Sequence, residues 1–198
     1  MFALVEDGSI TKYYSGNRGI TIGDNQYPKA IFTLWTKDDR EAIGIYEVGW
    51  DNSKKKSEEY YTNKNVSYAF GNGKVTASYG DATAKAHADT LFTAEDEENG
   101  LGTEGEVKVE GLKTKKIRNI KIQAAGILAE TDWYIVRKAD ADTAIPSAIT
   151  NHRAAVRTKC AEMETAITNA SNTAALETLY TRNNSGVRPL GDLPTLEV

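Results

Sequence analysis

The feature that most constrains this chain is an apolar repeat in its C-terminal third. Four residues recur at intervals of seven, and three more each follow one of them by four: Ile149, Val156, Met163 and Ala170, then Arg153, Cys160 and Ile167. This spacing places one stripe along a helix. A second stripe lies upstream, at Ile117, Ile120, Ala124 and Leu128. Residues 112–169 are therefore expected to form an antiparallel helical pair.

The polar positions of the upstream helix are expected to hold its cations, which are Lys113, Lys115, Lys116, Arg118 and Lys121. Between the two stripes, Thr131 or Asp132 is suited to cap a short helix, and a proline is suited to begin the next one. The tryptophan is expected to be buried in this bend. An arginine is expected to cap carbonyls there, or to pair with Asp132 or Glu162. The predicted structural corner comprises Asp132, Trp133, Pro146 and Arg153.

Several segments follow a recognisable order. Ile127 to Arg137 contains Thr131-Asp132-Trp133, and Ala144-Ile145-Pro146 and then Arg153-Ala154-Ala155-Val156-Arg157 come after it. The pattern resembles the C-terminal module of bacteriophage tail-fibre assembly proteins, also called tail assembly chaperones, and of related small tail proteins. Residues 1–48 are similar to the N-terminal module of that family, in which a short hairpin precedes a capped helix and a strand. Residues 49–110 depart from the pattern.

The resemblance implies a non-enzymatic tail protein that is made in the bacterial host cytoplasm and stays in the virion. It would join tail fibre or baseplate subunits as a structural adaptor. The alternative is a transient tail-fibre assembly chaperone that leaves the mature virion. The expected partners are other tail proteins, with self-association left open. Neither nucleic acid, a membrane nor a cofactor is expected.

Partner binding is assigned to two groups of residues. Tyr134, Arg137 and Arg157 are candidates because aromatic residues and arginine dominate interface energetics. The segment from residue 183 onward has no periodicity but carries spaced apolar anchors, namely Leu190, Leu193 and Leu196. It is expected to bind a partner as an extended docking peptide. The competing interpretation is that this tail wraps around its own helices.

The N-terminal half is expected to be β-rich. Phe2–Val5 and Ile10–Tyr14 predict strands around an Asp7-Gly8 turn, and residues 66–70 and 75–79 predict a second hairpin. Thr36 is expected to start a helix that ends near Gly44, before a strand at residues 45–48. Residues 81–94 have weak helical character, and residues 95–100 are expected to be an acidic turn.

Together these elements predict an α+β fold in four parts. The parts are an N-terminal α+β docking module (1–50), a central β-rich region (51–110), a helical module (111–182) and an extended tail (183–198).

Composition and residue chemistry narrow the function. A pI near 5.3 and a net charge of −4 argue against a nucleic-acid-binding protein. Residues 111–198 hold 12 basic and 9 acidic side chains. This excess of positive charge would attract an acidic partner surface, or the basic side chains would merely form a solvated helix face. His87 and His152 have no neighbouring ligand at metal spacing, and Cys160 lies on the apolar stripe, so no metal site and no catalytic residue is predicted.

Overall fold

The computed structural model describes residues 1–196 and contains two compact units. The first runs from Met1 to Thr83, and the second begins at Ala84. Each unit has its own set of buried apolar residues. Helices and strands both contribute, so the predicted α+β fold class is confirmed.

The first unit is built on a five-stranded sheet with the order β2-β1-β5-β8-β7. The strands are β1 (Phe2–Glu6), β2 (Ser9–Tyr14), β5 (Ile45–Asp51), β7 (Ser67–Gly71) and β8 (Lys74–Ser78). Both predicted hairpins are confirmed, since β1 pairs with β2 and β7 pairs with β8 in antiparallel register. Asp7, Gly8, Asn72 and Gly73 all have positive φ, which is the geometry of tight hairpin turns.

The boundary predicted after residue 50 is wrong. β5 continues to Asp51 and pairs in parallel with β8, with Val48 opposite Val75. The N-terminal module and the central hairpin therefore share one sheet and one unit. The polar residues that indicated a linker belong to the long connection that parallel strands require.

Shorter elements complete this unit: β3 (Ile20–Ile22), β4 (Asn25–Tyr27), η1 (Lys29–Phe32), α1 (Lys37–Ala42) and β6 (Tyr61–Thr62). β9 (Thr83–Ala84) begins at the last residue of the unit. β3 pairs with β4, and β6 pairs with β9. The capped helix is confirmed, because the Thr36 side chain and Asp39 form a capping box at the start of α1. Gly44 ends that segment with φ +78°, and a Cβ there would lie 2.7 Å from the carbonyl oxygen of Val5.

Both faces of the sheet are apolar because consecutive side chains of a strand point to opposite sides. Leu4 packs on one face with residues of η1 and β5, namely Ile31, Phe32 and Ile45. Ala3 packs on the other face with Val48, Val75 and Ala77.

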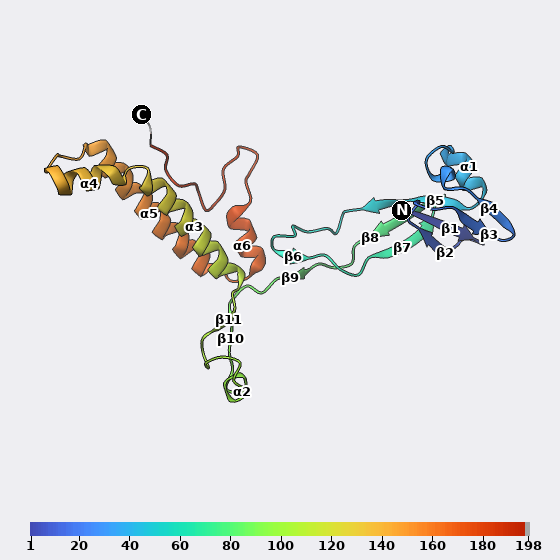
Figure 1. Ribbon diagram of the computed structural model, residues 1–198, viewed down its shortest axis with the longest axis horizontal. Helices are drawn as coiled ribbons and strands as arrows, with labels where there is room; N and C mark the ends of the chain where they lie inside the picture. Colours follow the sequence, from blue (N-terminus) through green and yellow to red (C-terminus); the bar gives the residue numbers. More distant parts are fainter. Residues whose placement is uncertain (197–198) are drawn as a thin grey trace. The chain divides into compact units, whose positions relative to one another are not determined.

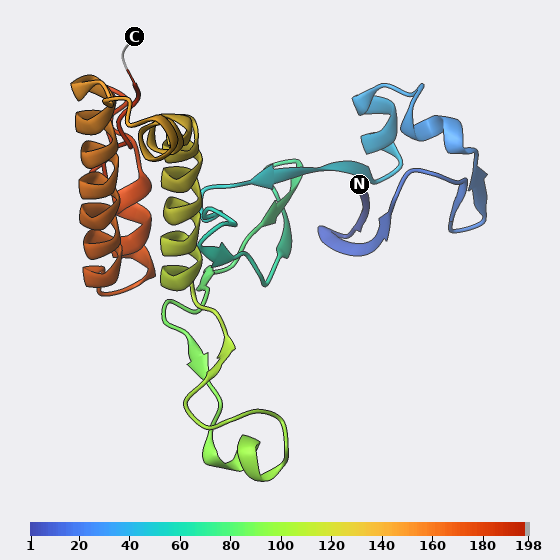
Figure 2. The same ribbon diagram turned by 60° about the vertical axis from the view of Figure 1, so that its left-hand side comes forward.

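The second unit contains four longer helices and a projecting ribbon. The helices are α3 (Leu112–Ala129), α4 (Asp132–Ala141), α5 (Ser147–Asn169) and α6 (Thr173–Tyr180), and the ribbon contains β10 (Thr90–Leu91), α2 (Ala94–Glu98) and β11 (Val107–Val109). α3 and α5 lie side by side and antiparallel, with α6 against them (Figures 1 and 2). α4 lies at the end of this pair remote from the ribbon.

Two local predictions for the ribbon are wrong. Residues 81–94 hold short strands instead of a helix, and the acidic run forms α2 instead of a turn. Thr93 and Asp96 form a capping box at the start of α2, which explains why this short run is helical. The boundary predicted at residue 110 is also not observed, because the ribbon belongs to the same unit as the helices.

The core of the helical bundle follows the predicted apolar repeat. On α5 the buried residues are Ile149, His152, Arg153, Val156, Cys160, Met163 and Ile167. Burial raises the pKa of the Cys160 thiol, as expected for a structural cysteine. On α3, Lys116 is buried and not on the polar face as predicted, because its ammonium lies 4.1 Å from the centre of the Tyr180 ring on α6.

Residues 85–89, here called the hub segment, organise the start of α3. Gly111 precedes this helix without a side-chain cap, and the first two N–H groups of α3, those of Leu112 and Lys113, donate instead to the carbonyl groups of Ala86 and His87 (2.9 and 3.1 Å).

The Asp89 carboxylate accepts from the Gly111 backbone N–H (2.7 Å) and the Thr114 hydroxyl (2.8 Å). The hydrogen bond from Gly111 has the largest effect on the pKa of Asp89, and the one from Thr114 has the next largest. Both lower this pKa below its usual value.

The hub segment also reaches the loop between α5 and α6. The His87 Nε2 lies 2.8 Å from the carbonyl oxygen of Ala170, and the Thr173 hydroxyl donates to the carbonyl of Lys85 at 3.1 Å. His87 is therefore bonded at one ring nitrogen, whereas its Nδ1 is buried without a partner among the described residues.

Candidate partner-binding surface

Arg153 fixes the corner between α3 and α4. Its guanidinium donates to the Leu128 carbonyl (2.6 Å) and the Thr131 hydroxyl (2.7 Å), and it pairs with Asp132 (2.8 Å). The first contact closes the C-terminal end of α3, where carbonyl groups lack helical partners. The predicted role of an arginine at this corner, as carbonyl cap and partner of Asp132, is confirmed.

Pro146 precedes the first residue of α5 as its N-cap, and it is exposed. Its fixed φ suits entry into a helix. The predicted position at a helix start is confirmed to within one residue.

Trp133 corrects the predicted corner. The ring is 51% exposed and does not pack between the helices. The buried space at this bend is taken by Thr131 and Arg153, which bond to each other, so no room for an indole remains. The tryptophan therefore belongs to the surface.

The exposed ring is held in a stack of three side chains. The Trp133 and Tyr134 ring centres lie 3.8 Å apart, and the Arg137 guanidinium lies 4.7 Å and 5.2 Å from them. Such a cation–π contact contributes about 0.5–1 kcal/mol at an exposed site. The Arg137 Nε is shielded from solvent and has no acceptor among residues 1–196. The stack is thus an ordered aromatic surface with one unsatisfied donor.

The rest of α4 extends this surface. None of the ten residues of the helix is buried, and both Ile135 and Val136 are exposed, the latter by 65%. α4 is therefore attached at its first turn while its apolar side chains face solvent. We refer to Trp133, Tyr134, Ile135, Val136 and Arg137 as the α4 surface.

The structure brings together Tyr134 and Arg137 but leaves the third predicted partner residue apart from them. Arg157 lies on α5, is exposed, and makes no hydrogen bond or ion pair within the part of the chain that the structure describes. Among the described residues, Arg157 shares no hydrogen bond, ion pair or ring contact with the α4 surface.

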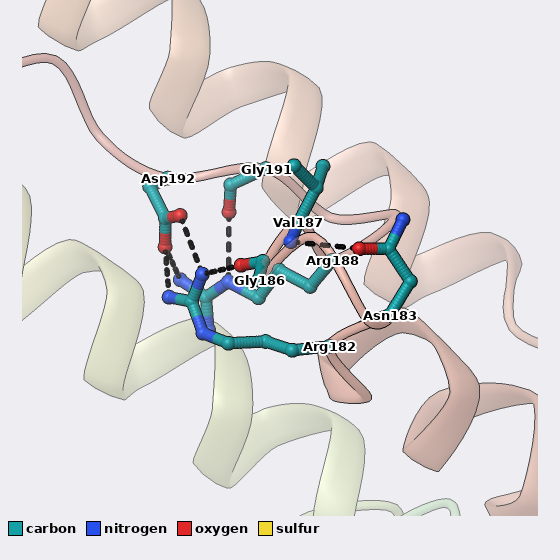
Figure 3. Close-up of polar contacts among 7 residues, drawn as sticks. All are labelled: Arg182, Asn183, Gly186, Val187, Arg188, Gly191 and Asp192. Carbon is teal, nitrogen blue, oxygen red and sulfur yellow. Dashed lines mark hydrogen bonds and ion pairs between the residues drawn. The ribbon is translucent and has the colours of Figure 1, made fainter.

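The C-terminal tail folds back on its own unit (Figure 3). The Asp192 carboxylate pairs with Arg182 (2.9 Å) and Arg188 (2.8 Å), and the Asn183 side chain accepts from the Val187 N–H (3.0 Å). The Arg182 bond, as the largest cause, lowers the pKa of Asp192. These contacts give the tail a defined turn without a regular element.

Leu190 is therefore not a free docking anchor, as it was predicted to be. It is 2% exposed, and its N–H donates to the Leu179 carbonyl of α6 at 3.0 Å. Leu193 and Leu196 are half-buried. The competing interpretation, in which the tail wraps around its own helices, fits these contacts. Residues 197 and 198 of the predicted tail lie outside the described residues.

A concavity lies in the first unit and has a volume of about 550 Å³. It is open and is lined by two cations and three tyrosines, namely Lys12, Arg18, Tyr13, Tyr14 and Tyr27. Burial, and then the charge of Glu6, raise the pKa of Tyr14. The described lining residues include no carboxylate, imidazole or thiol.

Within residues 1–196, no three His, Cys, Asp or Glu side chains are grouped so that they could hold a metal ion. The described helices include none with the length and apolar character required to cross a bilayer.

The hub segment was missed by sequence reasoning. Asp89 gives no local signal, because its partners lie 22 and 25 residues away along the chain. The one signal that could have indicated it is Gly111, a residue without a side chain directly before a strong helical pattern.

No protein-family model, curated protein or solved structure matches this chain.

Proposed function

We propose that this chain is a non-enzymatic structural component of a bacteriophage tail, an adaptor that joins tail fibre or baseplate subunits and stays in the virion. The resemblance of residues 127–157 and of the N-terminal segment to tail-fibre assembly proteins supports this proposal. The α4 surface is the structural observation that carries it.

The α4 surface has the properties of a protein-binding site. It joins two aromatic rings, two aliphatic side chains and an arginine on one short helix. Tryptophan, tyrosine and arginine are the residues most enriched at interface hot spots. Because Arg153 fixes the base of α4, the surface loses little freedom when a partner covers it.

The competing function is the transient chaperone. Both functions need an apolar surface that binds another tail protein, and they differ only in whether the chain remains after assembly. Mass spectrometry of purified virions of the encoding phage separates them. We expect the chain to be present at a fixed ratio to the tail proteins, and its absence would rule out the virion component.

A variant pair tests whether α4 carries the interaction. Trp133→Ser with Val136→Ser removes two exposed apolar side chains and should abolish incorporation into tails without unfolding the protein. Leu34→Ser is the matched control, because Leu34 is 80% exposed in the first unit and should be dispensable. Normal incorporation of the α4 variant would show that another surface binds the partner.

A further inference from the structure

Residues 90–110 form a projecting arm that begins at the hub segment. The arm comprises β10, α2 and β11, with α2 at its tip, and extends away from the helices of its unit (Figures 1 and 2). β10 pairs with β11 over only a few residues. A two-stranded ribbon of this size is marginally stable alone.

Polar contacts hold the arm together on one side. Asp96 accepts from the Thr93 N–H (3.0 Å) and pairs with Lys108 (2.6 Å). The Lys108 ammonium lies 5.6 Å from the centre of the Phe92 ring. Gly102 packs against this ring so closely that a Cβ would lie 2.5 Å from it. This side of the ribbon is therefore occupied.

The other side is apolar and uncovered. Leu91 lies directly opposite Val107, so these two side chains share a face of the ribbon, whereas a register shift places Val109 opposite Thr90. Leu91 and the two valines are about half-exposed, and Leu101 near the tip is 61% exposed. Nothing within the described residues covers this face.

A matching surface lies on α3. A shallow groove of about 440 Å³ is lined by Thr114, Ile117, Arg118, Lys121, Ile122 and Ala125. Ile122 is 62% exposed. Lys115 is exposed and lies one helical turn from Arg118 and two from Ile122, so it is on the same side of α3. The groove therefore has apolar residues in its centre and cations around them.

The two surfaces have opposite charge. The arm carries seven acidic residues and one lysine, whereas α3 carries five cations and no carboxylate. Apolar residues on both surfaces are bordered by these charges. The arm starts at the N-terminal end of α3 and points away from it (Figures 1 and 2). At its base Glu110 pairs with Arg118 of the same groove, and Lys121 pairs with Glu164 of α5 at 3.0 Å, so a second copy would meet Lys115 and these paired cations.

We propose that the arm of one copy docks in the α3 groove of a second copy. The apolar face of the ribbon covers Ile117 and Ile122, and the arm carboxylates face Lys115, Arg118 and Lys121. The contact joins two different surfaces of the protein. Copies linked in this way form a reciprocal dimer, a closed ring or an open filament. This self-association does not depend on the tail function proposed above.

Sedimentation velocity of the purified full-length chain tests the contact. We expect oligomers at low ionic strength whose mean mass falls as salt is added, because rim charges are screened. Glu98→Lys with Glu104→Lys on the arm should weaken association about tenfold or more, and so should Lys115→Glu with Ile122→Glu on the groove. Far-ultraviolet circular dichroism verifies that each variant is folded.

Mixing the two variants gives the decisive result. The reversed arm should dock in the reversed groove, so the mixture should associate although neither variant does so alone. Asp24→Lys and Lys74→Glu in the first unit are the control reversals and should leave association unchanged. A wild-type chain that stays monomeric at all salt concentrations would overturn the proposal. So would a mixture that stays monomeric, or controls that weaken association equally.

Discussion

The helical bundle and α4 belong to the same unit but use their apolar side chains in opposite ways. In the bundle, Val156, Met163 and Ile167 are buried against neighbouring helices. On α4, Trp133 and Val136 are at least half exposed. Hydrophobicity alone therefore does not decide which of these residues form the core.

The difference lies in how each region is fixed. The bundle is held by burial of apolar area, whereas α4 is held by the charged hydrogen bonds of Arg153. The arm resembles α4, because the Asp96 contacts hold it while Leu91 and Val107 face solvent. A segment that is positioned by polar contacts keeps its apolar side chains available for partners.

The largest expected effect is in the bundle. Ile167→Ala removes a fully buried side chain of α5 and should lower the free energy of unfolding by about 2–5 kcal/mol. Ile122→Ala is the matched control on exposed α3 surface and should stay within about 0.5 kcal/mol of wild type. Urea unfolding followed by far-ultraviolet circular dichroism measures both. Equal losses would contradict the contrast between core and surface.

Arg153→Met should release α4 while the bundle stays folded. The substitution keeps much of the apolar volume but removes charged hydrogen bonds that are each worth about 1.5–3 kcal/mol, so we expect a loss of this order. Hydrogen exchange of the Tyr134 amide, which donates to the Thr131 carbonyl, should become faster. Arg157→Met is the control and should leave exchange unchanged. Unaltered protection in Arg153→Met would show that another contact holds α4.

Gly111→Ala should destabilise the packing of the hub segment against the start of α3. A Cβ at this position would lie 2.3 Å from the Ala88 carbonyl carbon and oxygen, and overpacking of this kind costs about 1–3 kcal/mol. Gly126→Ala, in the open middle of α3, should instead stabilise the helix by about 0.5–1 kcal/mol. Thermal unfolding of the two variants should shift in opposite directions. A Gly111→Ala protein as stable as wild type would contradict the tight packing.

Trp133→Ala should have a small effect on stability. The ring is half exposed and its contact with Arg137 is worth about 0.5–1 kcal/mol, so we expect a loss of about 1 kcal/mol or less. A loss of about 3–5 kcal/mol, as for a fully buried tryptophan, would restore the buried corner predicted from the sequence. Denaturant unfolding distinguishes the two.

The smallest expected effect on stability is the loss of the Asp96 contacts in the arm at low pH. Two hydrogen bonds lower the pKa of Asp96 to about 2. The bond from Lys108 has the larger effect, and the bond from the Thr93 N–H has the smaller one. A lowered pKa in the folded arm means that the ionised carboxylate stabilises it. This contribution is present above the unfolded pKa of about 3.9 and is lost as the pH falls towards 2.

Amide NMR shifts of Thr93 and Asp96, followed between pH 5 and pH 2, should report this loss while the bundle amides stay constant. Asp96→Asn should remove the transition. A midpoint near pH 4 would show that Asp96 is not paired in solution.

Local patterns predicted much of the fold. The apolar repeat identified the buried residues of α5, because residues three and four apart share one side of a helix whatever surrounds it. Thr36 and the turns at Asp7-Gly8 and Asn72-Gly73 were equally local and were predicted correctly. In these cases the conformation depends on a few neighbouring residues.

The errors depend on distant partners. Lys116 is buried because Tyr180 lies over it, and β5 joins β8 through a parallel pairing that no turn specifies. Trp133 was placed in the core because tryptophan usually is buried, but Arg153 already fills the corner. Of the candidate site, the sequence identified Tyr134 and Arg137 but not that Trp133 joins them in one surface.

The hub segment also sets an order of folding events. Asp89 finds Gly111 and Thr114 after a separation of 22 and 25 residues, whereas His87 and Lys85 reach Ala170 and Thr173 only across 83 and 88 residues. On a chain emerging from the ribosome, the first pair of contacts forms early and prepares the start of α3. The second pair must wait until α5 is complete, since loop closure over a long separation comes late. We therefore expect α6 to be the last helix to join the unit.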